Sequence, residues 1–439
     1  MARVVLDLPA IDPVIAFAPF ADDPLAVLLD SAAKNDPRAR FSYIAADPVD
    51  LLVAQADDDP FAWIKQRQAR RRQPPLAHLP PFQGGIAGWL SYDLAQRLER
   101  LPASTSAQPR FPLAVLGEFD AIAAFDHHCG GAWVIGAAKA AQRLRERLLT
   151  PSSPPNDNGA TSPVAADLNP ADYQARVARV IKYILAGDVF QANLTQRFTA
   201  RLPQGLSPFD LYRRMRARAP APFAAFVASR DCALAAVSPE RFLALSADGR
   251  AETRPIKGTR PRGHDAVEDH ALARQLATSV KDRAENLMIL DLMRNDFSKV
   301  CALGSISAPQ RMELESFAAV HHLVSVVCGQ LRPGLDGVDL LRACFPPGSI
   351  TGAPKIRAME IIAELETAPR GPYCGAYGWF GDDGAMDLAV AIRIAACKDG
   401  LAIIHAGGAI TADSQPSAEW DETLVKAAPL IAALAEGSP

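Results

Sequence analysis

Short apolar runs separated by glycine, proline and other turn residues recur along the whole chain, a pattern typical of many short strands. Before residue 150 the runs predict strands at 84–93, 113–119 and 132–136. In the remainder of the chain the predicted strands are 193–198, 223–227, 232–237, 378–380, 388–396 and 401–405.

Other segments repeat their apolar residues at helical spacing. Asn169 is placed to cap a helix that begins at Pro170 and reaches about Leu185. Further helices are predicted at 267–295 (one long helix or two), at 355–365 and from Ser417 onward. Strands and helices are both abundant, but they do not alternate as regular β–α–β units. The pattern therefore predicts an α+β fold with largely antiparallel sheets.

A proline- and serine-rich stretch interrupts the chain at residues 151–163, and its composition is typical of a linker or loop. It separates an N-terminal region, residues 1–150, from a C-terminal region, residues 164–439. The N-terminal region contains no convincing catalytic set. The chemistry is therefore expected in residues 164–439.

Composition narrows the class of protein. The 439 residues are 49% hydrophobic, and 46 basic and 49 acidic side chains leave a net charge of −3. This balance gives no overall attraction to nucleic acid or to a membrane surface. No apolar run approaches the roughly 18 residues of a membrane-spanning helix, the N-terminus lacks a signal-peptide stretch, and the seven cysteines form no CxxC pair. We expect a reduced, cytoplasmic protein.

Residues 254–264 place Lys257 between a proline and a glycine, with arginines on both sides. Proline fixes the backbone before the lysine and glycine permits a turn after it, which predicts a loop that presents the amine. Neighbouring cations disfavour protonation of an amine, so the segment indicates a nucleophilic lysine. A solvated basic loop that contacts phosphate or an acidic partner is the alternative.

Two pairs of carboxylates stand three residues apart on predicted helices, Asp282 with Glu285 and Glu419 with Glu422. Residues at this spacing share a helix face. Two such faces together suit Mg²⁺, which prefers oxygen ligands and binds through few carboxylates. Either pair alone is also typical of a solvated helix face, and Lys426 is placed for an ordinary ion pair with Glu422.

Several other residues are candidates for binding or catalysis. Glu240 ends a predicted strand, where it would serve as a general acid or form a surface ion pair with Arg241. Arg393 lies in an apolar strand and needs a carboxylate partner, and Tyr373 could hydrogen-bond the same anion. His322, one of two adjacent histidines, is a candidate to face the cleft.

The glycine-rich turn at 345–355 contains Thr351 and Gly352 and leads into the helix at 355–365. Backbone N–H groups at such a helix start can bind an anion. The spacing is not that of a Walker loop, and a purely structural turn is the alternative.

Taken together, these motifs resemble those of the chorismate-utilising enzymes, a family that includes anthranilate synthase component I, isochorismate and salicylate synthases, and aminodeoxychorismate synthase component I. The resemblance spans about 240 residues in one order. The matching blocks are 190–198 (FQANLTQRF), 238–243 (SPERFL), 255–259 (PIKGT), 284–296 (AENLMILDLMRND), 348–360 (GSITGAPKIRAME) and 418–426 (AEWDETLVK).

The resemblance implies a large, mostly antiparallel two-sheet β-sandwich flanked by helices, similar to anthranilate synthase component I. Residues at two positions distinguish one type of enzyme in the family from another. Anthranilate synthases carry alanine where this chain has Lys257, which is similar to the aminodeoxychorismate synthases. Isochorismate-type members carry a lysine base where this chain has the neutral Gln191. Ammonia needs no such base, because it is already a nucleophile.

The family also implies roles for the matched residues. Mg²⁺ would be held by Glu285 and Glu422, with Asp282 and Glu419 behind water. Lys257 would attack the chorismate ring, Glu240 would protonate the departing hydroxyl, and ammonia would expel the lysine. The implied substrate-binding residues are Tyr373, Arg393, Thr351, Gly352, Gly408, Ala409 and Lys426, with His322 as a further catalytic candidate. Ala409 stands where the family usually has glycine, so its added methyl group costs something if that position needs a positive φ or a close approach to a carboxylate.

Leu29, Asp30 and Ser31 resemble the element that binds tryptophan in anthranilate synthase, although the family often has glutamate in place of Asp30. The chain contains no recognisable glutamine amidotransferase module, so ammonia is expected from a separate glutaminase subunit. Two alternatives remain: anthranilate synthase component I, and a non-catalytic sensor of tryptophan or chorismate.

Overall fold

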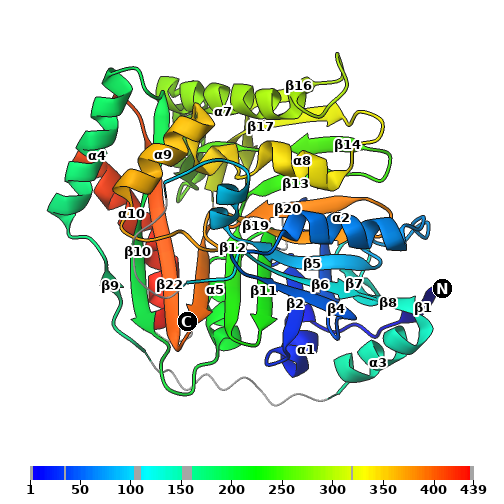
Figure 1. Ribbon diagram of the computed structural model, residues 1–439. Coiled ribbons are helices and arrows are strands. Elements are labelled where there is room, and N and C mark those ends of the chain that lie inside the picture. The colour runs from blue at the N-terminus through cyan, green and yellow to red at the C-terminus, as the bar shows by residue number, and fades with distance from the viewer. Residues whose placement is uncertain (1–2, 34–35, 103–109, 151–160, 318–319, 436–439) are drawn as a thin grey trace.

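Two antiparallel β-sheets pack face to face, and helices cover their outer sides (Figure 1). This arrangement confirms the α+β sandwich expected from the sequence. The computed structural model describes residues 3–33, 36–102, 110–150, 161–317 and 320–435.

The first sheet, sheet A, has the strand order β1-β8-β7-β3-β2-β11-β12-β21-β22-β10-β18, with β9 beside β10. Its strands are β1 (Arg3–Asp7), β2 (Leu25–Asp30), β3 (Phe41–Ala45), β7 (Ala121–Asp126), β8 (Gly131–Ala137), β9 (Ala165–Ala166), β10 (Gln191–Arg201), β11 (Phe223–Ser229), β12 (Cys232–Ser238), β18 (Gly352–Ala353), β21 (Ile394–Lys398) and β22 (Leu401–Ile410).

The second sheet, sheet B, has the order β15-β17-β14-β13-β20-β19-β5-β6-β4, with β16 beside β17. Its strands are β4 (Asp50–Ala54), β5 (Gly85–Leu90), β6 (Ala114–Phe119), β13 (Arg241–Leu245), β14 (Arg250–Thr253), β15 (Ile256–Pro261), β16 (Ser307–Ser316), β17 (Val320–Gln330), β19 (Ala376–Gly381) and β20 (Met386–Val390).

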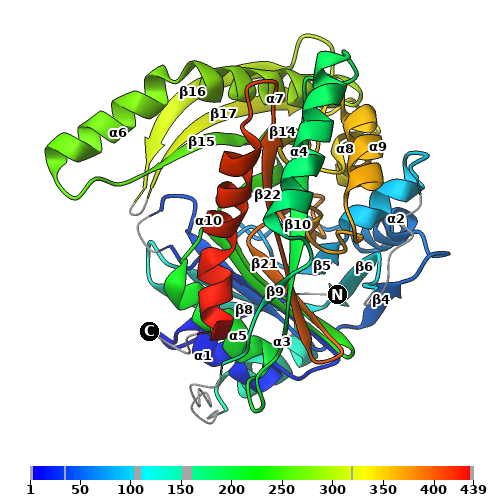
Figure 2. The same cartoon turned by 90° about the vertical axis from the view of Figure 1, so that its left-hand side faces the viewer.

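Helices cover both sheets. In Figure 2, α4 and α10 lie in front of β10 and β22, and α6 lies with β15–β17 at the edge of the molecule. The helices are α1 (Pro13–Phe17), α2 (Pro60–Arg71), α3 (Ala138–Leu148), α4 (Pro170–Leu185), α5 (Pro208–Arg218), α6 (Ala266–Thr278), α7 (Val280–Ser298), α8 (Gly337–Cys344), α9 (Lys355–Leu365) and α10 (Pro416–Ala435), with single 3₁₀ turns at η1 (Ala18–Phe20), η2 (Tyr92–Arg97) and η3 (Gly348–Ile350).

Local sequence accounts for the helix boundaries. The Asn169 side chain accepts a hydrogen bond from the backbone N–H of Asp172, so α4 begins where its cap predicts. The segment predicted as one helix or two is two, α6 and α7, because Ser279 adopts an extended conformation between them. The Ser279 side chain then caps α7 by accepting from the N–H of Asp282.

One predicted strand, residues 388–396, is wrong as a single element. It is two strands, of which β20 belongs to sheet B and β21 to sheet A. Between them, Arg393 has a left-handed backbone with a φ of 54°, which interrupts any regular strand. The chain therefore crosses from one sheet to the other at Ala391–Arg393.

Both sheets continue across the predicted boundary between residues 1–150 and 164–439. In sheet A, β2 pairs with β11, and in sheet B, β5 pairs with β19. The apolar side chains between the sheets come from both regions. Most of the predicted linker, residues 151–160, lies outside the described residues. The division into two regions stays a prediction, and the hydrophobic core of the described residues is built from both regions.

Because the core is shared, we expect both regions to unfold in one transition. Leu28 lies on β2 with its side chain fully buried, and truncation to alanine should cost about 2–5 kcal/mol. Leu28→Ala should shift a single calorimetric transition to lower temperature. Leu51→Ala, at a position that is 44% exposed, is the control and should change stability by less than about 1 kcal/mol. Two transitions, only one of them shifted, would contradict a shared core.

Candidate active site

The candidate site forms where the chain crosses between the sheets at two adjacent places. Residues 239–240 connect β12 of sheet A to β13 of sheet B, and residues 391–393 connect β20 back to β21. The N–H of Val237 donates to the carbonyl of Arg393 at 3.0 Å, and the N–H of Val390 donates to the carbonyl of Glu240 at 3.0 Å. These bonds hold the two crossings, and with them Glu240 and Arg393, next to each other.

Lys257 reaches this site from β15, so the predicted loop is in fact a strand. Its pairing with β17 shifts register between Ile256 and Thr259, and a bulge of this kind redirects side chains. Gly258 has a φ of 82°, which explains the glycine after the lysine. The Lys257 Nζ atom donates a hydrogen bond to the carbonyl of Ser349 at 2.8 Å.

The arginines beside Lys257 are not what lowers its pKa, contrary to the prediction from the sequence. Arg254 pairs with Glu315 at 2.6 Å and Arg260 pairs with Asp282 at 3.1 Å. The pKa of Lys257 is lowered mainly because burial disfavours the charged amine, and the nearby Lys426 adds to this. The lysine is therefore shifted toward its nucleophilic form by desolvation.

Glu240 is 5% exposed, so it forms no surface ion pair with Arg241, which instead pairs with Asp387 at 3.0 Å. Burial raises the pKa of the Glu240 carboxyl to about 7, against the opposing effects of a hydrogen bond with Ser349 and the charge of Lys257. A carboxyl group with this pKa holds its proton near neutral pH and can give it to a leaving group.

Ser349 joins the amine to the acid, and the sequence did not single it out. Its carbonyl accepts from Lys257 and from Asn193 Nδ2 at 3.0 Å. The buried guanidinium of Arg370 fixes this turn by donating to the carbonyl of Ile350 at 3.0 Å. A backbone carbonyl has no residue-type signature, so only the glycine-rich turn pointed to this segment.

Three carboxylates border the site from two helices, Glu285 from α7 and Glu419 and Glu422 from α10. The Ser414 hydroxyl donates to Glu419 Oε1 at 2.6 Å, but no described residue donates to the buried Oε2 atom. A methyl group placed on Gly408 would lie 3.0 Å from both Glu419 Oε2 and Glu422 Oε1. These two oxygens therefore face one spot, which glycine leaves open.

Asp282 differs from the other carboxylates because Arg260 already binds it. The predicted ion pair of Lys426 with Glu422 is confirmed. Within the described ranges, no three acidic, histidine or cysteine side chains are close enough to form a complete metal site. The unsatisfied oxygen of Glu419, and a Glu285 whose pKa is raised mainly by burial, nevertheless fit a cation that takes only one or two protein carboxylates.

Arg393, like Lys257, forms no ion pair with an acidic residue in the described part of the chain. Its Nη1 atom donates to the backbone carbonyl of Lys426 at 3.0 Å. Burial lowers its pKa, which makes an anionic ligand favourable. The buried Tyr373 is near enough to influence that pKa. That the two share an anion stays a prediction.

His322 lies beside the lysine strand, and its Nδ1 atom is 2.9 Å from Thr259 Oγ1. Burial lowers its pKa to about 4, so it is neutral near pH 7. Its catalytic role stays a prediction.

The remaining predicted substrate-binding residues flank the same place. Thr351 and Gly352 follow Ser349, and Gly352 pairs with Ala192. Gly408 and Ala409 lie on β22 opposite β10. Ala409 is absent from the residues with positive φ, so its methyl group causes no backbone strain.

Comparison with known proteins agrees with this geometry. The family model of the chorismate binding enzymes matches residues 26–432. The chain is a member of this family. It is 39% identical over 427 residues to aminodeoxychorismate synthase component 1 of Salmonella typhimurium, covering 93% of each chain. It is 38% identical over 451 residues to anthranilate synthase component 1 of Streptomyces coelicolor, covering 97% of this chain and 87% of that one.

The crystal structure of anthranilate synthase component I from Streptococcus pneumoniae aligns with a TM-score of 0.78 at 32% identity, covering 90% of this chain and 93% of that one. Chorismate carries two carboxylates, so a chorismate-binding site needs cations. Arg393 and Lys426 are cations of the candidate site.

The predicted tryptophan element lies at the end of β2, apart from the chorismate site. Leu29, Asp30 and Ser31 line a cavity of about 100 Å³. The Asp30 carboxylate already accepts from Tyr212 Oη at 2.7 Å and from Arg216 Nε at 2.5 Å. Tryptophan binding stays a prediction.

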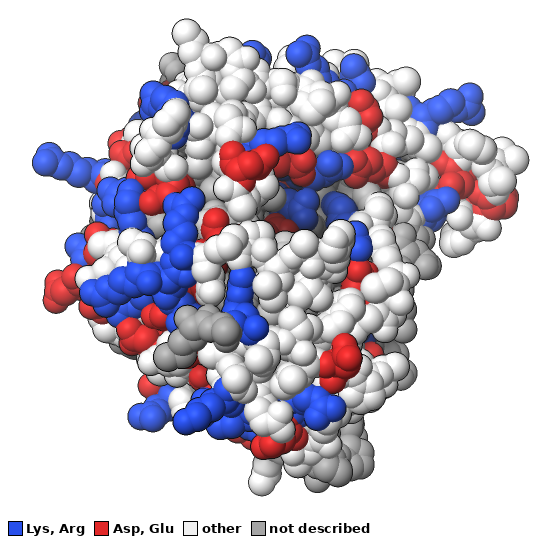
Figure 3. All heavy atoms as spheres, turned by 90° about the vertical axis from the view of Figure 1, so that its right-hand side faces the viewer, with Lys and Arg blue, Asp and Glu red and all other residues white. Residues whose placement is uncertain are grey.

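On the face drawn in Figure 3, basic and acidic side chains are interspersed with uncharged ones. None of the helices in the described chain combines the length and apolar character that crossing a membrane requires.

The raised pKa of Glu240 predicts a pH-dependent stability. The folded protein holds the Glu240 proton more tightly than the unfolded chain, whose pKa is near 4.5. Relative to Glu240→Gln, the wild type should therefore lose about 3 kcal/mol as the pH rises from about 4.5 to 7, and little more above that. Denaturant unfolding at a series of pH values measures this. The exposed Glu146→Gln should show no such trend, and a flat difference for Glu240→Gln would exclude the raised pKa.

Proposed function

We propose that this protein is the large subunit of an aminodeoxychorismate synthase. It would join ammonia to chorismate to give 4-amino-4-deoxychorismate, the precursor of p-aminobenzoate and folate. The observation that supports this most directly is the position of Lys257. Its desolvated amine donates a hydrogen bond to the Ser349 carbonyl. It also lies close enough to Glu240 for its charge to oppose part of the rise in the pKa of the Glu240 carboxyl. A lysine so placed suits covalent catalysis.

In the first step, the Lys257 lone pair attacks C2 of the chorismate ring. A C–N bond forms at C2, the two conjugated double bonds of the ring each move by one position, and the C4–O bond breaks. Glu240 gives its proton to the departing hydroxyl, which leaves as water. The lysine nitrogen carries the resulting positive charge until it returns a proton to the Glu240 carboxylate. Burial favours the starting form of both groups, the neutral amine and the neutral acid.

In the second step, ammonia attacks C4, both ring double bonds move back to their original positions, and the C2–N bond to Lys257 breaks. The proton lost by the new ammonium group is taken up by the departing lysine amine. The enolpyruvyl group is retained throughout. Two displacements thus replace one difficult substitution.

Binding of chorismate would use the cations and N–H groups of the site. Arg393 and Tyr373 would bind the enolpyruvyl carboxylate, and Lys426 would add positive charge. Glu285, Glu419 and Glu422 would hold Mg²⁺, with Asp282 farther away. When bound, this ion would neutralise the ring carboxylate.

Ammonia would come from a glutamine amidotransferase subunit, which hydrolyses glutamine and associates with this chain. Free ammonium would replace that subunit in vitro. Tryptophan would be a ligand of the Leu29–Ser31 pocket.

Anthranilate synthase component I is the second candidate, because the Streptomyces coelicolor enzyme of that name matches 97% of this chain. It would use the same ammonia and the same carboxylate-binding residues. The difference is the release of pyruvate, which gives an aromatic product. Lys257, in place of the alanine that anthranilate synthases carry, favours the first candidate.

The product separates the two candidates. Incubated with chorismate, Mg²⁺ and ammonium, the protein should form 4-amino-4-deoxychorismate, detected by mass spectrometry and converted to p-aminobenzoate by an added lyase. Omitting Mg²⁺ should remove turnover. Fluorescent anthranilate and pyruvate, formed without a lyase, would support the second candidate and exclude the first.

Lys257→Ala tests the covalent intermediate. With chorismate and no ammonia, intact-mass spectrometry should show an adduct on the wild type and none on the variant. Turnover should fall by roughly 10³-fold or more. Lys65→Ala, which removes a half-exposed amine on α2, should keep both the adduct and the activity. Unchanged turnover in Lys257→Ala would refute the nucleophile.

A further inference from the structure

Arg370 carries a buried charge that has no part in the reaction steps described above. It lies between α9 and β19, and only 2% of its surface is exposed. Its Nε and Nη2 atoms donate to the two carboxylate oxygens of Glu366, at 2.9 and 2.7 Å. A bidentate pair of this kind fixes the plane of the guanidinium group. The Arg370–Glu366 ion pair is therefore a rigid unit inside the protein.

This ion pair joins two segments of the chain. Arg370 Nη2 also donates to the carbonyl of Asn193 on β10 at 2.8 Å, and Nη1 donates to the carbonyl of Ile350 at 3.0 Å. Glu366 binds β10 as well, because its Oε1 atom accepts from the N–H of Thr195 at 2.9 Å and from the Thr195 hydroxyl at 2.8 Å. The ion pair thus ties β10 to the turn around Ile350.

The position of that turn determines where Lys257 is held. Ile350 directly follows Ser349, whose carbonyl accepts from Lys257 Nζ at 2.8 Å and from Asn193 Nδ2 at 3.0 Å. A neutral amine attacks through a single lone pair, and a hydrogen bond donated through one of its N–H groups restricts where that lone pair points. Because a nucleophile must be aligned with the atom it attacks, the Ser349 carbonyl orients the amine.

We propose that the Arg370–Glu366 ion pair positions the nucleophile of the covalent step, through the carbonyl that binds Lys257. The inference rests on the proposed function, because it concerns the same amine and the same attack on the chorismate ring. Arg370 and Glu366 are positioning residues in this account. They act through β10 and the turn around Ile350 rather than on the substrate.

Arg370→Lys tests the positioning role while keeping the buried charge. A lysine ammonium carries its donors on one atom and cannot reach all four oxygens that the planar guanidinium binds, so the turn should shift. With chorismate and no ammonia, the rate constant for formation of the Lys257 adduct at saturating chorismate should fall about 10- to 100-fold. The Kd for chorismate should change by less than about threefold, because Arg393 and Lys426 stay in place.

Thr195 allows a milder form of the same test. Its side chain is buried, and Thr195→Val replaces the hydroxyl that binds Glu366 with a methyl group of similar size. Formation of the adduct should slow by about threefold or more. Thr195→Ser, which keeps the hydroxyl, should restore the wild-type rate. These two variants decide the question alone if Arg370→Lys does not fold.

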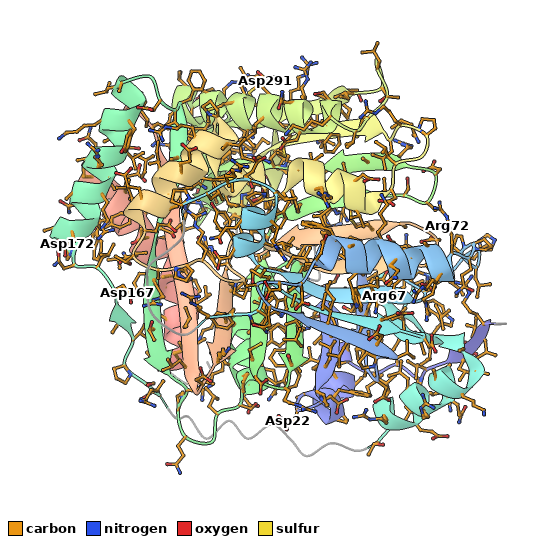
Figure 4. The ribbon with its side chains drawn as sticks, viewed as in Figure 1. Asp22, Arg67, Arg72, Asp167, Asp172 and Asp291 are labelled. Carbon is orange, nitrogen blue, oxygen red and sulfur yellow. The ribbon has the colours of Figure 1, made fainter. Side chains whose placement is uncertain are left out.

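Arg197→Lys is the matched control, because Arg197 is another arginine at β10 whose side chain is largely buried, with 17% exposed. It pairs with Asp167 at 2.7 Å and has no hydrogen bond to the turn among the described residues. Asp167 is labelled beside β9 in Figure 4. The control should form the adduct at the wild-type rate even where its melting temperature falls.

The outcomes separate this inference from the proposed function. If the wild type forms no adduct, the covalent step fails and the positioning role fails with it. If the wild type forms the adduct and both Arg370→Lys and Thr195→Val form it equally fast, the positioning role fails while the proposed function stands. A loss of rate that Arg197→Lys shares, in proportion to lost thermal stability, would show a purely structural role and would also overturn the inference.

Discussion

Two backbone hydrogen bonds, from Val237 to Arg393 and from Val390 to Glu240, determine where the site can form. Each joins a residue of one sheet-to-sheet crossing to the neighbouring crossing. Corners at which strands change sheets leave the regular ladder, so their side chains are free to face a cleft. With the corners held together by these bonds, the backbones at Glu240 and Arg393 lie next to each other. Lys257 approaches from sheet B, where its Nζ atom donates to the Ser349 carbonyl.

Desolvation shifts both Glu240 and Lys257 toward their neutral forms. Removal from water disfavours the charged form of any group, so it raises the pKa of Glu240 and lowers that of Lys257. Their mutual attraction acts in the opposite direction and would favour an ion pair, which is inert as both acid and nucleophile. For each group burial is the largest influence. A more open site would shift the balance toward the ion pair.

The sequence predicted the parts that depend on side-chain identity. The capped helix α4, the strands flanking the site, Lys257, Glu240 and the carboxylates of α7 and α10 were all identified from residue type and spacing. The sequence could not reveal that the predicted strand 388–396 is interrupted at Arg393. Apolar residues continue on both sides of Arg393, and a left-handed backbone angle has no signature in the sequence. Ser349 was missed for a related reason, since its contact with the lysine uses a carbonyl that every residue has. The effect of burial on Lys257 was assigned to arginines that turn out to be paired elsewhere.

The function proposed above would use two successive nucleophiles, which places a demand on the architecture that a single displacement does not. Lys257 would have to remain near C2 of the ring while ammonia approaches C4. The structure suits this demand, because Lys257 belongs to β15, which pairs with β17, and its Nζ atom is held by the Ser349 carbonyl. Ser349 in turn lies in a turn that the buried Arg370 fixes through the carbonyl of Ile350. An amine positioned by a paired strand and a fixed carbonyl keeps its place without rearrangement of the surrounding side chains.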